Sequence, residues 1–259
     1  MNSNNGLFRG VIGSKFIWLD EVDSTNDYLK ANIEALPHGT LLAAGHQTGG
    51  KGTRGRGWSD KPNTSLMFSV LLKDLSFPQL SCLSLVTGLS VCEALAGTVN
   101  ADFYVKWPND IVTSGRKLCG ILCESRLSGE NVNAIIGIGV NLLQTAEEFA
   151  AHGLVYATSL RLATEKTFEP LPLAAKIAER LDINLAEYKD NGFSGDLRAR
   201  YKTRCITLGH ECLIIRGESE VAAFAHDVKE DGSLLCEING SLEQLYSGDV
   251  SVRGLYGYV

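Results

Sequence analysis

The sequence predicts an α+β protein in which a long segment of mixed strands and helices precedes a small all-β unit. Between residues 15 and 202, apolar runs of strand length alternate with segments whose apolar residues recur at helical spacing. After residue 206, four short apolar runs are separated by the turn sequences RGES, KEDG and NG. We therefore expect a flexible lead at 1–14, a mixed domain at 15–205 and a small β domain at 206–259.

Each element follows from a local pattern. The helix expected at 23–36 begins at a capping Ser24 or Asp23 and carries apolar residues at helical spacing. Residues 48–64 contain five Gly and one Pro, which predicts a long loop. Pro108 lacks an N–H, so the strand in FYVKWPNDI should end in a turn. The other expected elements are strands at 15–20, 39–47, 65–72, 117–125 and 132–142, the last two paired, and helices at 80–97 and 171–202, the second broken at Gly192.

Composition excludes several classes of protein. Hydrophobic residues make up 44% of the 259 residues and charged residues 21%, as in a globular protein with a real core. The net charge of −6 argues against binding of long nucleic acid, and a local basic spot on such a chain suits a small anionic ligand. No run approaches the ~18 apolar residues of a membrane span, and the first residues lack the apolar core of a signal peptide. We expect a cytoplasmic protein with no membrane partner.

The seven cysteines form no CxxC pair, and no His lies at zinc-ligand spacing from them. They predict buried, reduced thiols and no metal site built by the protein. Cys119 and Cys123 lie four apart in one apolar run, so as strand residues they would share a face.

The stretch GHQTGGKGTRGRGW, residues 45–58, begins like a Walker A phosphate loop. That loop needs Ser or Thr directly after its Lys, but Gly52 follows Lys51, and the glycines beyond it and Pro62 exclude the helix that must follow. What remains is a Gly-rich loop with three positive charges beside Trp58, which suits a nucleotide whose phosphates need neutralising and whose base needs a platform. The alternative is a solvated basic loop.

Four segments, in this order and spacing, resemble the biotin protein ligase family: DSTN (23–26), QTGGKGTRGRGW (47–58), VKWPNDI with KLCGIL (105–111 and 117–122), and IIGIGVNL (135–142). The resemblance is strongest over residues 15–145 and continues to LYSGDVSVR near the C-terminus. Too few residues precede Asp23 for the DNA-binding module that many bacterial members carry, so the chain resembles the monofunctional type.

The resemblance implies a mixed-sheet catalytic domain of the biotin/lipoate ligase type followed by a small C-terminal β-barrel. It also implies an enzyme that uses ATP with Mg²⁺ to activate biotin as biotinyl-5′-AMP. Biotin then passes to a specific lysine of a biotin carboxyl carrier protein or domain, such as that of acetyl-CoA carboxylase. Biotin, ATP and this carrier are the expected partners, nucleic acid is not one, and a homodimer is left open.

The resemblance also assigns the site residues. Biotin would be bound by Ser24, Thr25, Asn26, Gln47, Lys51, Gly52, Thr53, Lys117, Gly120 and Gly139. The nucleotide would be bound by Arg54, Arg56, Trp58, Lys106, Asn109, Asp110 and Asn141. Hydroxyls and amides suit the ureido ring of biotin, which offers two N–H donors and one carbonyl acceptor.

The predicted catalytic residues are cations, namely Lys117, Lys51 and Arg56, because the reaction brings two anions together and gathers charge on the phosphate oxygens. Lys117 is the central choice. No general base is evident among the histidines, and Asp110 is the candidate base for the acceptor lysine. We expect residues 48–60 to be mobile in the free enzyme and to fold over the adenylate.

Plainer interpretations stand beside these. Ser24 can be an ordinary helix N-cap with Asp27 as its capping-box partner, Trp58 a core residue and Lys106 a lysine reaching solvent. A lipoate-type ligase, or a regulator that binds biotin or nucleotide without catalysis, is the alternative function. One departure matters: the family loop usually carries Arg where this chain has Thr53, so either Arg54 compensates or the adenylate is held loosely.

Overall fold

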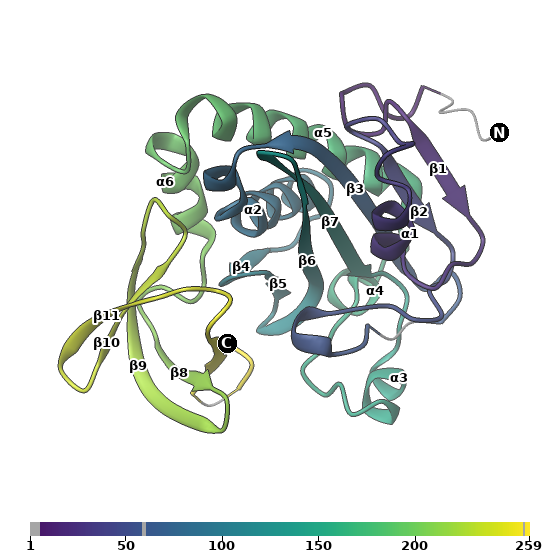
Figure 1. Ribbon diagram of the computed structural model, residues 1–259. Helices are drawn as coiled ribbons and strands as arrows, with labels where there is room; N and C mark the ends of the chain where they lie inside the picture. The colour runs from purple at the N-terminus through teal and green to yellow at the C-terminus, as the bar shows by residue number, and fades with distance from the viewer. Residues whose placement is uncertain (1–5, 59–60, 256) are drawn as a thin grey trace.

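The computed structural model describes residues 6–58, 61–255 and 257–259 and contains two β-sheets (Figure 1). The first sheet has seven strands in the order β1-β2-β3-β7-β6-β5-β4, with a parallel β1–β2 pair and antiparallel pairs elsewhere. Its strands are β1 (Phe16–Leu19), β2 (Leu41–Ala44), β3 (Ser65–Leu75), β4 (Tyr104–Lys106), β5 (Asp110–Thr113), β6 (Arg116–Ser128) and β7 (Asn131–Asn141). The predicted mixed sheet is confirmed, including the pairing of β6 with β7.

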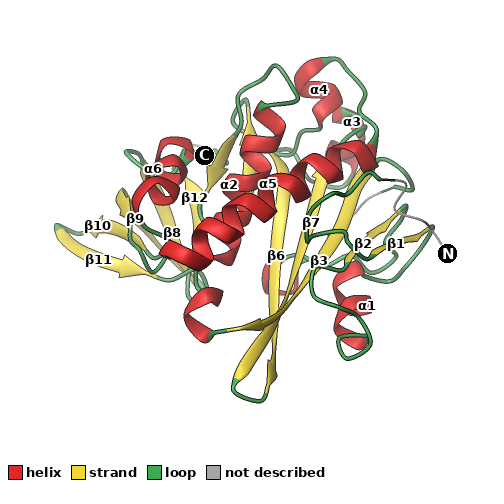
Figure 2. Cartoon of the chain, turned by 90° about the horizontal axis from the view of Figure 1, so that it is seen from above, coloured by secondary structure: helices red, strands yellow, loops and turns green. Residues whose placement is uncertain are grey.

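Helices cover both faces of this sheet unequally (Figure 2). Helices α2 (Leu83–Ala96) and α5 (Pro170–Asn191) pack over one face, and the short α1 (Thr25–Ala31) packs on the other. Alternation along the strands explains the division, since Phe68 and Ile138 join the α2–α5 core whereas Leu71 and Ile135 pack under α1. The remaining helical segments are the turns Thr53–Gly55 and Phe77–Leu80, α3 (Ala146–Ala151), α4 (Leu160–Thr164) and α6 (Gly195–Arg204).

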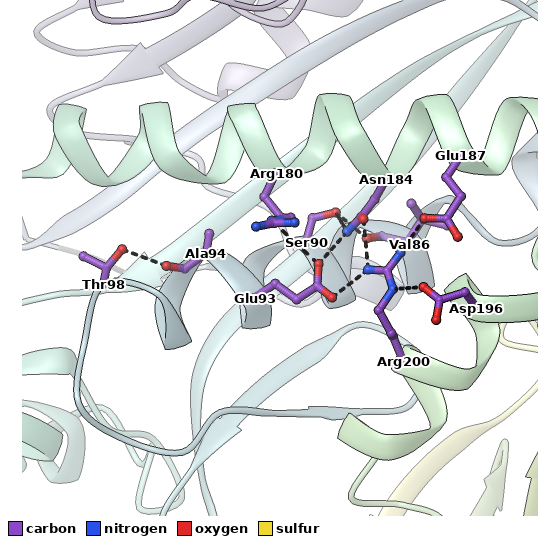
Figure 3. Close-up of polar contacts among 10 residues, drawn as sticks. All are labelled: Val86, Ser90, Glu93, Ala94, Thr98, Arg180, Asn184, Glu187, Asp196 and Arg200. Carbon is purple, nitrogen blue, oxygen red and sulfur yellow. Dashed lines mark hydrogen bonds and ion pairs between the residues drawn. The ribbon is translucent and has the colours of Figure 1, made fainter.

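Arg200 of α6 ties the helical layer together (Figure 3). Its guanidinium donates to Glu93 on α2 at 2.7 Å, to Asn184 on α5 at 3.2 Å and to Asp196 at 2.7 Å, and it also pairs with Glu187. One cation thereby neutralises three carboxylates from three helices. The spacing of these helices behind the sheet is fixed by this network as well as by apolar packing.

The second sheet has five antiparallel strands in the order β11-β10-β9-β8-β12. They are β8 (Glu211–Arg216), β9 (Ser219–Val228), β10 (Leu234–Ile238), β11 (Ser241–Leu245) and β12 (Ser251–Gly254). The small all-β unit is thus confirmed, and its described pairing leaves β11 and β12 at the edges of the sheet. The boundary expected near residue 206 falls between α6 and β8.

The two sheets meet at the β4–β5 turn. Trp107 is fully buried there and donates its indole N–H to the carbonyl of Gly232 at 3.0 Å and its backbone N–H to Thr207 Oγ1 at 3.0 Å. Lys106 donates its ammonium to the carbonyl of Val252 on β12 at 2.7 Å. The turn that carries the KWPND motif is therefore also the joint between the sheets.

Residues 6–14 correct the expectation of a flexible lead. Phe8 and Ile12 are buried in the main core, and the backbone N–H of Ile12 lies 3.1 Å and 3.2 Å from the carboxylate oxygens of Asp182 on α5. Burial of these apolar side chains and a carboxylate acceptor from a distant helix hold the segment in place. Residues 1–5 lie outside the described part of the chain.

Other differences are at element ends. The helix expected at 23–36 runs only over Thr25–Ala31, and the helix expected at 80–97 is preceded by a separate turn at Phe77–Leu80. Within the described residues, no helix combines the length and the apolarity needed to cross a bilayer.

Candidate functional site

Two adjoining cavities lie beside β6. The first has a volume of about 500 Å³, open solvent at its mouth included, and is lined by every residue predicted for biotin, namely Ser24, Thr25, Asn26, Gln47, Lys51, Gly52, Thr53, Lys117, Gly120 and Gly139, together with Trp58 and Asn109. The second lies between the two sheets, has a volume of about 1880 Å³ with open solvent included, and is lined by Arg54, Arg56, Lys106 and Asp110, among others. Thr53, Asn109, Ile121 and Leu122 line both cavities, so the two adjoin.

One end of the first cavity is polar and already hydrogen-bonded. Gln47 Oε1 accepts from the backbone N–H of Thr25 at 2.7 Å and from its hydroxyl at 2.9 Å. Ser69 Oγ lies 2.6 Å from Asn26 Oδ1 and 2.7 Å from Thr25 Oγ1. The acceptor that the structure gives Gln47 Nε2 is the thioether of Met67, at 3.3 Å, which is weak and leaves this amide suited to a ligand carbonyl.

Ser24 is both a cap and a wall of the cavity. It has extended backbone angles, and its Oγ accepts from the N–H of Asp27, as the N-cap interpretation expects. Ser24, Thr25 and Asn26 are nevertheless each at most 4% exposed and line the cavity. The N-cap role is therefore confirmed and is compatible with a place in the cavity wall, while binding of biotin by this motif stays a prediction.

Lys51 lies at the outer edge of α1. Its ammonium is 2.6 Å from Asp27 Oδ2, and this bond with Lys51 is the chief cause of a lowered pKa at Asp27. Lys30 in turn donates to Glu124 at 2.5 Å, and Glu124 accepts from Asn26 at 2.9 Å. Because Lys30 also lies 3.6 Å from Asp27, Lys51, Asp27, Lys30 and Glu124 form a chain of ion pairs along the rim of the cavity. Half of the Lys51 side chain remains exposed.

Glycines make the floor of the cavity flat. Gly120 on β6 and Gly139 on β7 are directly paired across the strands. A Cβ at Gly120 would lie 2.9 Å from the Trp58 indole, and one at Gly139 would lie 2.8 Å from it, so only glycine lets the ring rest on the sheet. Trp58 Nε1 is buried here and has no hydrogen-bond partner among the described residues. A buried unpaired N–H is unfavourable, so this position of the ring carries a free-energy cost in the free site.

The basic loop has a defined shape between Gly50 and Trp58. The Trp58 N–H donates to the Gly50 carbonyl at 2.8 Å, and the Gly52 N–H donates to the Arg56 carbonyl at 2.7 Å. Arg56 reaches back to Thr53, with its guanidinium 3.3 Å from both the carbonyl and the hydroxyl oxygen. Arg54 has φ of 60° and is exposed. The mobility expected for 48–60 stays a prediction, and residues 59 and 60 lie outside the described part.

Lys117 stands where the two cavities meet. Its backbone is held at both sides, because its N–H donates to Tyr156 and its carbonyl accepts from Thr158, each at 2.8 Å. Its ammonium lies 2.6 Å from Asp110 Oδ1 and 5.9 Å from the centre of the Trp58 ring. The predicted central cation therefore lines the polar cavity and contacts Asp110, which lines the basic one.

Charge is concentrated around the buried Asp110. Burial acts to raise the pKa of Asp110, but the charges of Lys117 and Lys106 and the bonds from Lys117 and Tyr258 outweigh it, and the pKa is lowered. Burial lowers the pKa of Lys106 to about 8, although Asp110 opposes this shift. Asp110 therefore stays ionised, and Lys106 is a cation that gives up its proton easily.

Asn141 is the predicted site residue that lines neither cavity. It is buried at the end of β7 on the same face as Gly139, and its side-chain amide donates to the Thr158 carbonyl at 3.0 Å. Sequence reasoning missed Ser69 and Gly137, which meet Asn26 on the cavity face of the sheet. Strand alternation could have found both residues. Gly137 lies two residues from Gly139 on β7, and Ser69 lies two residues from Met67, the cross-strand partner of Gly139 on β3, so both share the face of Gly139.

Metal ligands are sparse at the site. Among the described residues, no group of three or more His, Cys, Asp or Glu side chains is arranged to hold a metal ion. The oxygen groups facing the basic cavity beside Lys106 include Asp110 and Asn109. This donor set does not fit an ion held by the protein alone.

Comparisons with known proteins agree with this geometry. The sequence profile of the Biotin/lipoate A/B protein ligase family matches residues 18–141. The biotin–[acetyl-CoA-carboxylase] ligase of Paracoccus denitrificans is 30% identical over 224 residues, which is 84% of this chain and 92% of that relative. The bifunctional ligase/repressor BirA of Bacillus subtilis is 27% identical over 251 residues, covering 95% of this chain and 77% of the relative.

Solved structures give the same grouping. The biotin protein ligase from Aquifex aeolicus in complex with biotin and ATP is 32% identical, with a TM-score of 0.79, and covers 93% of this chain and 99% of that one. The apo structure of the same Aquifex aeolicus protein has a TM-score of 0.78 over the same coverage. The similarity therefore includes the second sheet as well as the matched segment.

Replacing Gly139 by Ala should expel the indole from the floor, because the new methyl group would lie 2.8 Å from the ring. We expect Trp58 emission, isolated as the difference from a Trp58→Phe variant, to shift to the red and to become accessible to acrylamide. The control is Gly97→Ala, whose Cβ would meet two carbonyl oxygens at the ordinary contact distances of 3.4 Å and 3.8 Å. Unchanged Trp58 emission in Gly139→Ala would show that the ring does not rest on this glycine.

Lys106 should make stability depend on pH in a specific window. Its pKa is lowered to about 8 from 10.5, so the unfolded state binds more protons between these values, and stability gains as pH rises through them. Relative to Lys106→Met, wild type should therefore gain on the order of 2–3 kcal/mol between pH 7.5 and about 10.5. The charged groups that face Lys106 are Asp110, Lys117, Arg56 and Arg253. Urea unfolding across this range measures the difference, and a constant difference contradicts the shifted Lys106.

Proposed function

The chain belongs to the biotin protein ligases of the biotin/lipoate A/B family, and from this premise we propose that it is an ATP-dependent biotin–protein ligase. It would form biotinyl-5′-AMP from biotin and ATP. It would then transfer the biotinyl group to a lysine of a biotin carboxyl carrier domain of a carboxylase.

The observation that carries this proposal is the position of Lys117 in the wall of a polar cavity, 2.6 Å from Asp110 in the wall of an adjoining basic one. The polar cavity offers amides and hydroxyls at one end and a glycine floor along its length, which suits a ureido ring and an apolar chain. The basic cavity is lined by Arg54, Arg56 and Lys106, which suits polyphosphate. A carboxylate at the end of the first ligand and a phosphate of the second would both meet Lys117.

The first step joins two anions. A biotin carboxylate oxygen attacks the α-phosphorus of ATP, the new C–O–P linkage forms, and pyrophosphate leaves with the bonding electron pair. The carboxylate is ionised at neutral pH, so this step needs charge neutralisation and alignment rather than a base. Lys117 would neutralise the meeting oxygens, and the cations of the basic cavity would receive pyrophosphate.

The second step transfers the acyl group. The amine of the carrier lysine attacks the carbonyl carbon of biotinyl-5′-AMP, an amide forms, and AMP leaves. The attacking amine must lose a proton, but the lowered pKa of Asp110 makes this carboxylate a weak base. Asp110 is better suited to hold Lys117 than to take that proton.

Magnesium would arrive with ATP. The sparse carboxylates of the site do not build a metal centre, so triphosphate oxygens would supply most of its ligands. The reduced thiols of the seven free cysteines support a cytoplasmic setting for the reaction.

The test mixes the protein, magnesium, ATP and biotin with a carrier domain and follows the mass of the carrier. We expect one biotinyl group on the carrier lysine, and Lys117→Met should slow its addition by about 100- to 1000-fold, as for loss of one charge-stabilising donor. The control is Lys166→Met, an exposed lysine between α4 and α5.

Other results of this assay separate the alternatives. Addition of lipoate instead of biotin would assign the chain to the lipoate-type ligases. Binding of biotin and ATP without any turnover would assign it to the regulators.

Thr53 should weaken retention of the adenylate. Its hydroxyl accepts from Arg56 and brings no charge of its own, whereas the family loop usually has Arg at this position. We expect wild type to release free biotinyl-5′-AMP, and Thr53→Arg to lower that release by about tenfold, as for one added charge-assisted contact.

The readout for Thr53→Arg is free adenylate separated from the protein by filtration. Thr48→Arg is the control, because Thr48 is exposed on the same loop and lines neither cavity. Equal release by Thr53→Arg and wild type would mean that Arg54 or Arg56 already supplies the charge.

A further inference from the structure

Tyr258 reaches from the second sheet into the cluster of charges around Asp110. It follows β12, and its hydroxyl donates to Asp110 Oδ2, the carboxylate oxygen that Lys117 leaves to other partners. Its ring lies under the ammonium of Lys106, 4.3 Å from the ring centre to Nζ. One side chain thus contacts both charged ends of the β4–β5 turn.

The tyrosine is held in this position from two sides. Its backbone carbonyl accepts from the N–H of Gly254 at 3.3 Å, which folds the chain back onto β12. Its ring stacks on Tyr156, with centres 6.2 Å apart and planes tilted by 29°. The carbonyl of Tyr156 is also the acceptor for the backbone N–H of Lys117.

The two halves of Tyr258 have different consequences. The hydroxyl supplies a donor to a carboxylate that lies 2.6 Å from Lys117, and so helps the two lysines to stabilise its negative charge. The ring face covers a cation that also donates to the Val252 carbonyl of β12, at 2.7 Å. The hydroxyl therefore acts on Lys117 through Asp110, and the ring acts on Lys106 directly.

We propose that Tyr258 is a positioning residue of the active site, through which the second sheet sets the placement of Lys117 and Lys106. This inference rests on the proposed function, since these lysines face the cavities assigned to biotin and ATP. The hydroxyl keeps Asp110 from engaging Lys117 with both oxygens, so Lys117 stays available to the anions of the first step. The ring keeps Lys106 at the wall of the basic cavity.

The test uses two substitutions that separate these contacts. Tyr258→Phe removes the hydroxyl and keeps the ring, whereas Tyr258→Leu removes both. Tyr246→Phe is the matched control, because the hydroxyl of Tyr246 also donates to a carboxylate, that of Asp231, but on the exposed surface of the same sheet. Biotin-dependent exchange of pyrophosphate into ATP gives kcat and KM for the first step, and calorimetry gives the affinity for ATP without turnover.

We expect Tyr258→Phe to lower kcat by about tenfold while KM for ATP and the ATP affinity stay near wild type, as for loss of one hydrogen bond to a charged group. Tyr258→Leu should show the same loss in kcat and, in addition, a KM for ATP and an ATP dissociation constant raised about three- to tenfold. Tyr246→Phe should match wild type in every measurement.

Several results would overturn the proposal. Wild-type kcat in Tyr258→Phe rejects the role of the hydroxyl, and unchanged ATP affinity in Tyr258→Leu rejects the role of the ring. If Tyr258→Phe loses activity through kcat and KM together, and its unfolding midpoint falls as well, then Tyr258 contributes to stability alone.

Failure of the proposed function is distinguishable from these results. In that case wild type itself exchanges no pyrophosphate in the presence of biotin. Calorimetry with Tyr258→Leu then still decides whether the ring positions Lys106 for nucleotide.

Discussion

The alignment of residues across the first sheet is the constraint on which the site depends. Lys106 pairs with Asp110, Asp110 with Gly120, and Gly120 with Gly139, so one straight row crosses four strands. Directly opposed residues share a face, and the row therefore places two charges and a bare glycine floor side by side. A register slip of one residue would turn Asp110 and the glycines into the α2–α5 core and bring apolar neighbours to the ligand face. The buried Trp107 opposes such a slip, because its hydrogen bonds to Thr207, which precedes β8, and to Gly232, between β9 and β10, fix the turn that begins the row.

Within that row, one carboxylate organises the cations. Asp110 is 9% exposed and would be unstable as an isolated charge, so its position requires partners of opposite charge and donors. Lys117, Lys106 and Tyr258 supply them, two from the first sheet and one from beyond β12. This arrangement explains why the lysines do not repel one another out of the site. The segment beyond β12 thus contributes to this cluster, because the first sheet alone would leave Asp110 without the donor that Tyr258 supplies.

Much of the site could be predicted from the sequence, because contiguous motifs encode these parts of it. KWPND followed by KLCGIL encodes a turn, a strand and their charges within about 20 residues, and strand alternation then places Gly120 on the ligand face. Contacts between distant segments were not readable. Nothing in GLYGYV indicates that Tyr258 reaches Asp110, and the polar-looking start of the chain conceals that Phe8 and Ile12 are core residues. Ser69 is an intermediate case. A serine within an apolar strand is visible in the sequence, but its partner, Asn26, is known only from the fold.

In the free site, most polar groups that would bind a ligand are already hydrogen-bonded within the protein. At the polar end, Thr25 and Asn26 already have partners in Gln47 and Ser69, so a ureido group must exchange hydrogen bonds rather than find unpaired ones. On the floor, the Trp58 ring covers the glycines that would otherwise expose backbone to water, yet its Nε1 is left without a partner in the described structure. Hydrogen bonds exchanged one for one contribute little net free energy. Affinity must then come from apolar contact with the floor and from charge neutralisation at Lys117. Apolar contact with the glycines requires the indole to leave Gly120 and Gly139, so ligand binding on the floor depends on the mobility predicted for residues 48–60.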